Sequence, residues 1–193
     1  NDLMSKRSKN STKDRLHIEP QSFCPKFNNS GQTVYIALGS NKGNSTAHFI
    51  QARSFLQKIS ASPIRASRVY QTEPIGPSDT DFLNAVICID WKSSPEALLA
   101  RLKEQEGIQG RPSRYPKWTC RTLDLDIIDF GGLILKYDYL KLPHPSIAER
   151  LFVLLPLNDL APEWSDPVTK KNISELINQA PEMRIELGAW QWE

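Results

Sequence analysis

Residues 123–130 read Leu-Asp-Leu-Asp-Ile-Ile-Asp-Phe, a run that begins with strict alternation of apolar and acidic side chains. Alternation with a period of two predicts a β-strand with one buried face. Asp124 and Asp126 then share one face, about 7 Å apart along the strand, while Leu123 and Leu125 share the other. We therefore expect a strand that is half-buried in a sheet and carries a pair of carboxylates on its open face.

Upstream of this strand, strand and helix patterns follow one another in a definite order. Runs rich in β-branched and aromatic residues predict strands at 33–38, 64–71 and 84–91. Apolar residues at helical spacing predict helices at 47–59 and 94–105. With the acidic strand last, the order is strand, helix, strand, strand, helix, strand. This is the split βαβ arrangement of a ferredoxin-like domain.

Downstream, the patterns are shorter. We expect a hairpin near 133–137, a loop centred on Pro143-His144-Pro145 and a helix near 173–179. The predicted fold class is therefore α+β, a ferredoxin-like βαββαβ core with a C-terminal extension of short strands and a helix.

Charge and composition divide the chain into three parts. Residues 1–30 hold six basic and three acidic residues, which leaves 18 basic and 19 acidic residues for the rest. So polar a segment cannot bury enough surface to offset its ordering entropy, and we expect a disordered or linker tail there. Residues 31–180 are predicted to form one domain and residues 181–193 a C-terminal extension or linker. Because the positive excess lies in the tail, it does not indicate that the folded part binds nucleic acid.

Cysteine spacing and hydropathy exclude several protein classes. Cys24, Cys88 and Cys120 are far apart in the sequence, which favours neither a disulfide framework nor a zinc site. The longest wholly apolar stretch, residues 151–157, is far too short to span a membrane. No apolar signal segment lies near the start, so we expect a cytoplasmic protein, with a mitochondrial location as the alternative.

The loop before the acidic strand is basic: residues 111–121 contain Arg111, Arg114, Lys117 and Arg121 and no acidic residue. Mg²⁺ usually binds one or two carboxylates together with substrate phosphates, and arginines take up the phosphate charge that the metal leaves. An Asp-x-Asp pair alone is more often the solvated face of a strand. Next to this basic loop, the pair favours a magnesium–nucleotide site.

Two other segments have the residue types of a ligand site. The proline-rich loop 72–77 leads to Phe82 and Asn84, which suit a flat polar heterocycle through stacking and hydrogen bonding. Alone this signal is weak, because a phenylalanine such as Phe82 is more often a core residue and Asn84 can simply cap the turn. His144 stands between two prolines near Arg150, where it can donate a hydrogen bond to phosphate, although a lone histidine is more often structural.

Together these segments resemble the hydroxymethyldihydropterin pyrophosphokinase family. The characteristic pieces occur in the family's order between Val34 and Pro162. They are Ala37 to Asn41; Tyr70-x-Thr72-x-Pro74-Ile75-Gly76; Phe82-Leu83-Asn84; Glu106 with Gly110-Arg111; Trp118-x-x-Arg121-Thr122-Leu123-Asp124-Leu125-Asp126; Pro143-His144-Pro145; and Glu149-Arg150-x-Phe152. The arginine–threonine–leucine–aspartate run is the most specific of these pieces.

The resemblance implies an enzyme that transfers pyrophosphate from ATP to 6-hydroxymethyl-7,8-dihydropterin with the help of two Mg²⁺ ions. It implies that Asp124 and Asp126 hold the metal and that Arg111 and Arg121 act on the phosphates. Trp118 would lie on a loop that closes over the site. Implied pterin-binding residues are Thr72, Pro74, Ile75, Phe82, Asn84, Trp118 and Phe152, and implied ATP-binding residues are Glu106, Arg111, His144 and Arg150. The resemblance also allows fusion to other folate-pathway domains.

Three alternatives stay open. An RNA-binding module has the same element order but needs aromatic residues on its central strands. Another magnesium–nucleotide transferase would share the acidic pair. The chain also departs from the family pattern at Ser113, at Thr119-Cys120 and at Ser146. These departures make a catalytically degenerate domain, kept for interaction within a folate enzyme assembly, the main alternative.

Overall fold

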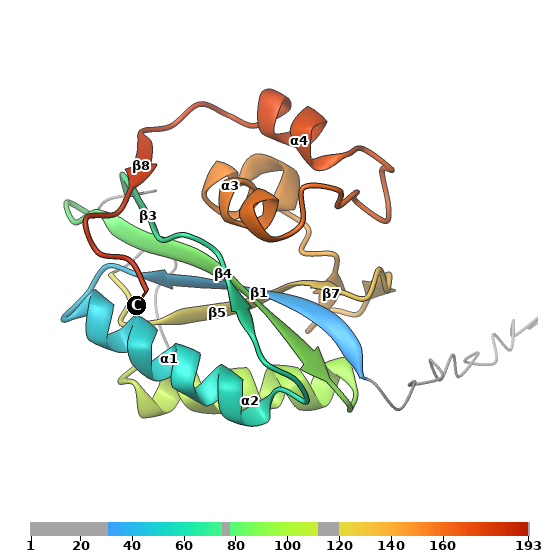
Figure 1. Cartoon of the computed structure of the whole chain (residues 1–193), viewed down its shortest axis with the longest axis horizontal. Helices are drawn as coiled ribbons and strands as arrows, with labels where there is room; N and C mark the ends of the chain where they lie inside the picture. The colour runs from blue at the N-terminus through green and yellow to red at the C-terminus, as the bar shows by residue number, and fades with distance from the viewer. Residues whose placement is uncertain (1–30, 75–77, 112–119, 193) are drawn as a thin grey trace, which may run out of the picture.

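The computed structural model describes residues 31–74, 78–111 and 120–192. An antiparallel sheet forms its centre (Figure 1). The long strands are β1 (Gln32–Ser40), β4 (Phe82–Trp91) and β5 (Asp124–Phe130), and the short ones are β2 (Arg65–Ala66), β3 (Tyr70–Thr72) and β8 (Ile185–Leu187). The strand order is β5-β1-β4-β3-β8, and β2 also pairs with β4.

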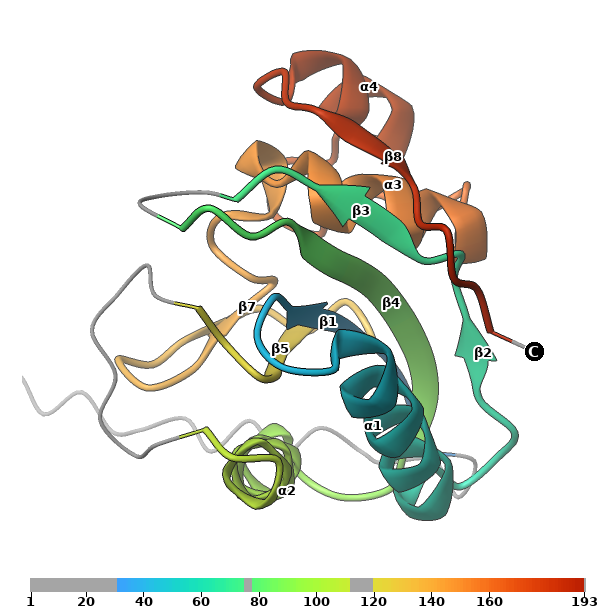
Figure 2. The same cartoon turned by 90° about the vertical axis from the view of Figure 1, so that its left-hand side faces the viewer.

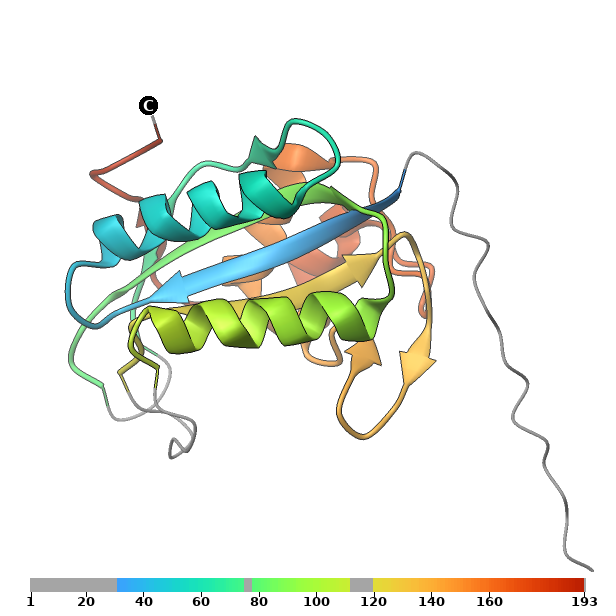
Figure 3. The same cartoon turned by 90° about the horizontal axis from the view of Figure 1, so that it is seen from below.

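Helices cover both faces of the sheet. In Figures 2 and 3, α1 (Ser45–Ile59) and α2 (Pro95–Ile108) lie on one face, and Figure 2 places α3 (Leu151–Leu160) and α4 (Ile173–Gln179) on the other. A small hairpin of β6 (Leu135–Lys136) and β7 (Lys141–Leu142) and a 3-10 turn at Ile147–Glu149 join β5 to α3. Polar side chains cap the helix starts: Asn44 caps α1, Ser94 caps α2 and Asn172 caps α4. None of the described helices has the length and apolar content needed to cross a membrane.

Each face of the sheet buries its own apolar cluster. Alternation along β1 sends Val34, Ile36 and Leu38 toward α1 and α2, and Tyr35 toward α3. On the α3 face, Val86 and Ile128 pack with Val153, Leu154 and Leu157 of the helix. Polar residues at the strand ends lie beyond this second cluster, and this is where the cavity described below opens.

The element order and the sheet order confirm the predicted α+β, ferredoxin-like arrangement, but the second predicted strand differs. Residues 64–71 were expected to form one strand, whereas the structure has β2 and β3 with an irregular segment between them. The Ser67 hydroxyl accepts a hydrogen bond from the Val86 backbone N–H (2.9 Å). A side chain thereby takes a bond that a backbone carbonyl makes in regular pairing, and the strand is interrupted. The second helix also continues to Ile108, beyond the predicted end at Gln105.

The C-terminal segment adds one more strand to the sheet. β8 pairs antiparallel with β3, so residues near 185 lie beside residues near 70. Figure 1 shows this return of the chain to the sheet after α4.

Candidate active site

A cavity of about 400 Å³ opens at one end of the sheet face that carries α3. Its floor includes a row of paired residues, in which Gly39 of β1 lies between Asn84 of β4 and Asp124 of β5. Asp126 is two positions further along β5, opposite Ala37. Since residues two apart on a strand share a face, both carboxylates line the cavity, as the alternation predicts. The other lining residues are Leu38, Thr72, Glu73, Ser78, Phe82, Arg121, Ser146, Arg150, Phe152 and Val153.

Arginines hold both carboxylates. Asp124 forms ion pairs with Arg111 through one oxygen and with Arg121 through the other. Asp126 Oδ2 lies 3.5 Å from Arg150 Nη1. The Asp124 side chain is 16 % exposed and that of Asp126 35 %, so a ligand in the cavity can reach both. The cluster therefore places cations and anions side by side at one wall.

Glu106, on α2, ties Arg111 to β5 from behind the cavity. Its Oε2 lies 2.8 Å from Arg111 Nη1, and its Oε1 accepts a hydrogen bond from the Leu125 backbone N–H (2.7 Å). Burial raises the pKa of Glu106, while the positive charge of Lys103 acts in the opposite direction. Because this buried carboxylate fixes both a guanidinium and the strand that carries Asp124, it positions the acidic wall without lining the cavity.

The acidic pair fits a magnesium ion that is completed by substrate oxygens. In the described part of the chain, no group of three or more His, Cys, Asp or Glu side chains is arranged to hold a metal. That rules out a cage made of these protein ligands among the described residues. It is compatible with Mg²⁺, which commonly uses one or two carboxylates, several waters and the phosphates of its substrate. Asp124 and Asp126 are the residues that would hold it.

Aromatic and amide side chains in the same cavity suit a flat heterocycle. Phe82 of β4 and Phe152 at the start of α3 reach the cavity from different elements. Asn84 Nδ2 donates a hydrogen bond to Thr72 Oγ1 (2.9 Å) in a buried pair. Two aromatic surfaces and a fixed amide are the features expected for a ring with a polar edge.

His144 lies behind the wall at Ser146. Its Nδ1 accepts a hydrogen bond from the Ser146 backbone N–H (3.2 Å), and its own backbone N–H donates to the Ile128 carbonyl (2.9 Å). Burial lowers the pKa of His144, and the positive charge of Arg150 lowers it further. The imidazole is therefore neutral at physiological pH and fixes the loop that carries Ser146.

The structure brings most of the predicted site residues together. Those that line the cavity are Thr72, Phe82, Asn84, Arg121, Asp124, Asp126, Arg150 and Phe152. Arg111 reaches the cluster through Asp124, whereas Glu106 and His144 lie behind the lining residues. Pro74 is half-buried and is not one of the lining residues. Ile75 and Trp118 lie outside the described residues, as do Ser113 and Thr119.

Asn41 is not among the predicted site residues, yet it joins three loops around the cavity. Its Nδ2 donates to Ser78 Oγ (3.0 Å) and to the Thr80 carbonyl (3.2 Å), while its Oδ1 accepts from the Arg121 backbone N–H (2.7 Å). The side chain is buried, so these bonds form away from water. The available signal was an asparagine at the end of a predicted strand, within the segment Ala37 to Asn41 that belongs to the family pattern.

Comparison with known proteins shows the family of this chain. Residues 35–162 match the family model described as 7,8-dihydro-6-hydroxymethylpterin-pyrophosphokinase. The chain belongs to this family. It is 37 % identical over 149 residues to the 2-amino-4-hydroxy-6-hydroxymethyldihydropteridine pyrophosphokinase of Haemophilus influenzae, an alignment that covers 76 % of this chain and 92 % of that one. The same enzyme of Pseudomonas aeruginosa is 38 % identical over 157 residues, which are 80 % of this chain and 96 % of that one.

Longer proteins also contain a related segment. The folate synthesis bifunctional protein of Arabidopsis thaliana is 42 % identical over 130 residues, covering 67 % of this chain and 27 % of that protein. Among solved structures, the Plasmodium falciparum HPPK-DHPS chain aligns with a TM-score of 0.60 at 14 % identity, over 77 % of this chain and 44 % of that one. At this identity the likeness concerns the fold alone, and it agrees with the ferredoxin-like arrangement of the pyrophosphokinase family.

Proposed function

We propose that this pyrophosphokinase-family chain transfers the β,γ-pyrophosphoryl group of ATP to 6-hydroxymethyl-7,8-dihydropterin, a step of folate biosynthesis. The observation that supports this most directly is the cavity itself. Its lining combines the charged side chains of Asp124, Asp126, Arg121 and Arg150 with Phe82, Asn84 and Phe152, and the Arg150 guanidinium lies over the Phe152 ring at 5.8 Å. Charged groups beside aromatic and amide groups match a donor triphosphate beside a pterin.

The reaction is a displacement at phosphorus. The pterin hydroxymethyl oxygen forms a bond to the β-phosphorus, the bond from the β-phosphorus to the bridging α,β-oxygen breaks, and AMP leaves with that oxygen. Such transfers depend mainly on alignment and on stabilisation of charge. Arg121 is positioned to stabilise the phosphate charge, because its backbone N–H is bonded to Asn41 while its side chain lines the cavity.

Each ligand has its own set of proposed contacts. Phe82 and Phe152 bind the pterin ring, and the Thr72–Asn84 pair reads its polar edge, with Pro74, Ile75 and Trp118 as further predicted contacts. Arg111, Arg121 and Arg150 bind the phosphates, while Glu106 and His144 support them from behind. When bound at Asp124 and Asp126, Mg²⁺ would neutralise phosphate charge and help to align the transferred group.

The alcohol proton needs an acceptor at the cavity wall. Asp124 is held by two arginines, whereas Asp126 has the more exposed side chain and a single 3.5 Å contact with Arg150. We therefore assign proton acceptance to a carboxylate oxygen of Asp126, directly or through one water.

The test is ³¹P NMR of the protein with Mg-ATP, with and without 6-hydroxymethyl-7,8-dihydropterin. We expect AMP and a new diphosphate ester only when the pterin is present. Asp126→Ala should abolish turnover and Arg121→Ala should slow it by about 10²-fold or more. ADP as the product would contradict pyrophosphoryl transfer. ATP binding without turnover would favour the degenerate-domain alternative, with Ser146 at the cavity wall as one cause.

Cellular context stays a prediction. Plant relatives carry further sequence beyond the matched segment, and the one from Pisum sativum is named as mitochondrial. For this chain we propose a cytoplasmic location. We also propose fusion to another folate-pathway domain, which the length of the natural polypeptide would test.

A further inference from the structure

The C-terminal strap, defined here as residues 184–192, runs along the outer edge of the sheet. Its strand β8 lies beside β3 (Figure 2), with Tyr70 paired to Leu187 and Thr72 to Ile185. Thr72 is also a floor residue of the cavity, bonded to Asn84. The strap lies beyond residues 35–162, the part of the chain that matches the family. It therefore supports one side of the cavity from outside the segment that carries the catalytic motifs.

Arg184 links the two ends of the segment that joins β3 to β4. Its backbone N–H donates to Glu73 Oε1 (2.8 Å), and its carbonyl accepts from the Glu73 backbone N–H (3.3 Å). Its guanidinium donates twice to Asp81, from Nη2 to Oδ1 (2.6 Å) and from Nη1 to Oδ2 (3.1 Å). Glu73 directly follows β3 and Asp81 directly precedes β4. One residue of the strap thus fixes both ends of the segment.

The geometry of this link is specific for arginine. Two parallel N–H···O bonds to one carboxylate fix its orientation as well as its position. Gln71 Nε2 also donates to Asp81 Oδ2 (2.9 Å). Hydrogen bonds from Arg184, and then from Gln71, lower the pKa of Asp81, so this carboxylate stays ionised at physiological pH.

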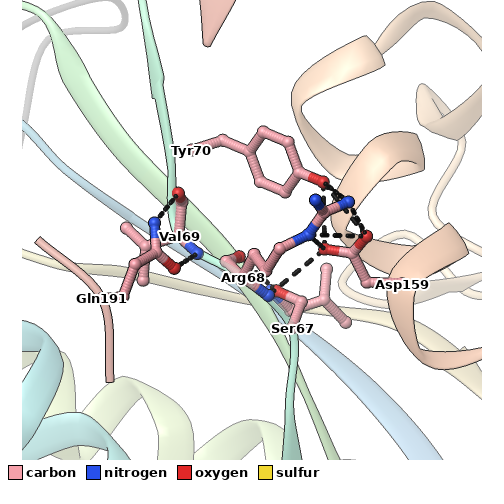
Figure 4. A network of polar contacts seen from close by, with 7 residues as sticks. Ser67, Arg68, Val69, Tyr70, Asp159 and Gln191 are labelled. Atoms are coloured by element: carbon pink, nitrogen blue, oxygen red, sulfur yellow. Dashed lines mark hydrogen bonds and ion pairs between the residues drawn. The ribbon is translucent and has the colours of Figure 1, made fainter. Parts of the chain in front are cut away.

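The other end of the strap bonds the backbone of the irregular segment between β2 and β3. The side-chain amide of Gln191 accepts from the Val69 N–H (2.8 Å) and donates to the Val69 carbonyl (2.8 Å), as Figure 4 shows. Trp192 Nε1 donates to the Ser67 carbonyl (2.7 Å), and its ring stacks on Phe49 of α1 at 5.7 Å. The strap is therefore anchored at both of its ends.

A second anchor holds β3 and the residues just before it from the α3 side. Asp159 of α3 binds the Arg68 guanidinium (2.6 Å) and accepts a hydrogen bond from the Tyr70 hydroxyl (3.0 Å) (Figure 4). β3 is thus fixed by α3 on one side and by the strap on the other. The phosphate-binding candidate Arg121 and the metal-binding candidates Asp124 and Asp126 are on or next to β5, at the opposite edge of the sheet.

We propose that the C-terminal strap positions the pterin side of the cavity, with Arg184 as the positioning residue that holds Glu73 and Asp81 in place. This rests on the proposed function, because it takes Thr72, Phe82 and Asn84 as pterin contacts. Since the strap meets β3 and not β5, its loss should weaken pterin binding while leaving nucleotide binding intact.

The test compares Arg184→Met, Asp81→Ala and the double variant with the unchanged protein. Calorimetry measures the Kd of 6-hydroxymethyl-7,8-dihydropterin in the presence of Mg²⁺ and α,β-methylene-ATP, and separately the Kd of that nucleotide. Arg101→Met is the matched control, because Arg101 and Arg184 both have side chains that are 50 % exposed and paired with acidic residues. Amide hydrogen exchange at Glu73 reports on the link itself.

We expect the pterin Kd to rise about 5-fold in each single variant and by little more in the double variant, since both single variants already remove the ion pair between Arg184 and Asp81. Glu73 exchange should become faster in the same variants. The nucleotide Kd should change by less than about twofold in all variants. In the Arg101→Met control, the pterin Kd and the Glu73 exchange rate should also change by less than about twofold.

Equal pterin binding in all variants would overturn the positioning role alone. Equal losses of pterin and nucleotide affinity, with a lower Tm, would overturn it in favour of a general stabilising role. Failure of the unchanged protein to bind the pterin would overturn the proposed function, and the positioning role with it.

Discussion

Gly39→Ala should make the protein slightly more stable and at the same time impair its site. Gly39 lies in β1 on the cavity floor, and its φ is not in the left-handed region. A Cβ at this position would meet Asn84 Oδ1 and Asp124 Cβ at 3.9 Å and Phe82 Cδ1 at 4.0 Å. These are ordinary van der Waals distances, so the protein accepts the methyl group without rearrangement.

The two effects have opposite signs. Replacing glycine by alanine within a strand stabilises the fold by about 0.5–1 kcal/mol, because the unfolded chain loses conformational freedom. The same methyl group stands between the proposed pterin contacts and the acidic pair, where a bound ligand would pack against the floor. Overpacking of a fitted contact costs about 1–3 kcal/mol, which is a loss of about 5- to 150-fold in affinity.

The assay combines urea unfolding with calorimetric titration of the pterin and the nucleotide analogue. Gly107→Ala is the matched control, because Gly107 lies in α2 and a Cβ there would meet nothing within 4 Å. The control should gain about 1 kcal/mol of stability and bind both ligands unchanged. Unchanged affinities in a well-folded Gly39→Ala variant would refute the reasoning, because they would mean that no ligand packs against this part of the floor.

Three further predictions concern titrating groups near the site. Burial lowers the pKa of His144, so the neutral imidazole stabilises the fold fully above pH 6.5, its ordinary pKa, and this stability is lost as the pH falls below 6.5. Urea unfolding from pH 8 to 5 should show the loss in the unchanged protein and not in His144→Asn. Burial and the bond to Asp159 raise the pKa of Tyr70 to about 12, so the late part of the tyrosine titration, followed by absorbance at 295 nm, should move to lower pH in Asp159→Asn. Glu106→Gln keeps an acceptor for the Leu125 N–H but loses the charge that holds Arg111, and we expect on the order of 10-fold weaker nucleotide binding by calorimetry.

Local patterns in the sequence were sufficient for the core of the fold and for the acidic wall. Alternation in 123–130 placed Asp124 and Asp126 on one face, and the structure has both at the cavity. The order of strands and helices was equally informative, because each long element carries its own periodicity. These features depend on residues that are near one another in the sequence.

Contacts between distant segments could not be predicted in this way. The bond of Ser67 to Val86 that interrupts the second strand joins residues 19 positions apart, and those of Asn41 to Arg121 and of Arg184 to Asp81 span 80 and 103 positions. A polar residue shows no periodicity that would indicate its partner. His144 illustrates the same limit, because its loop is held by a backbone bond to Ile128, a distant residue in β5, and its side chain is buried behind the lining residues.

The arrangement around Asp124 explains how one group of side chains can serve before and after a nucleotide binds. A carboxylate at the floor of a partly closed cavity is costly unless it is paired, and Arg111 and Arg121 supply that pairing. Each guanidinium carries five N–H donors, so it can hold a carboxylate with some and reach a phosphate with the others. Glu106 keeps Arg111 in place from behind, and Asn41 does the same for the backbone of Arg121. The phosphate-binding groups are thus oriented in advance by the residues that would hold the metal, so that little ordering cost remains when the triphosphate arrives.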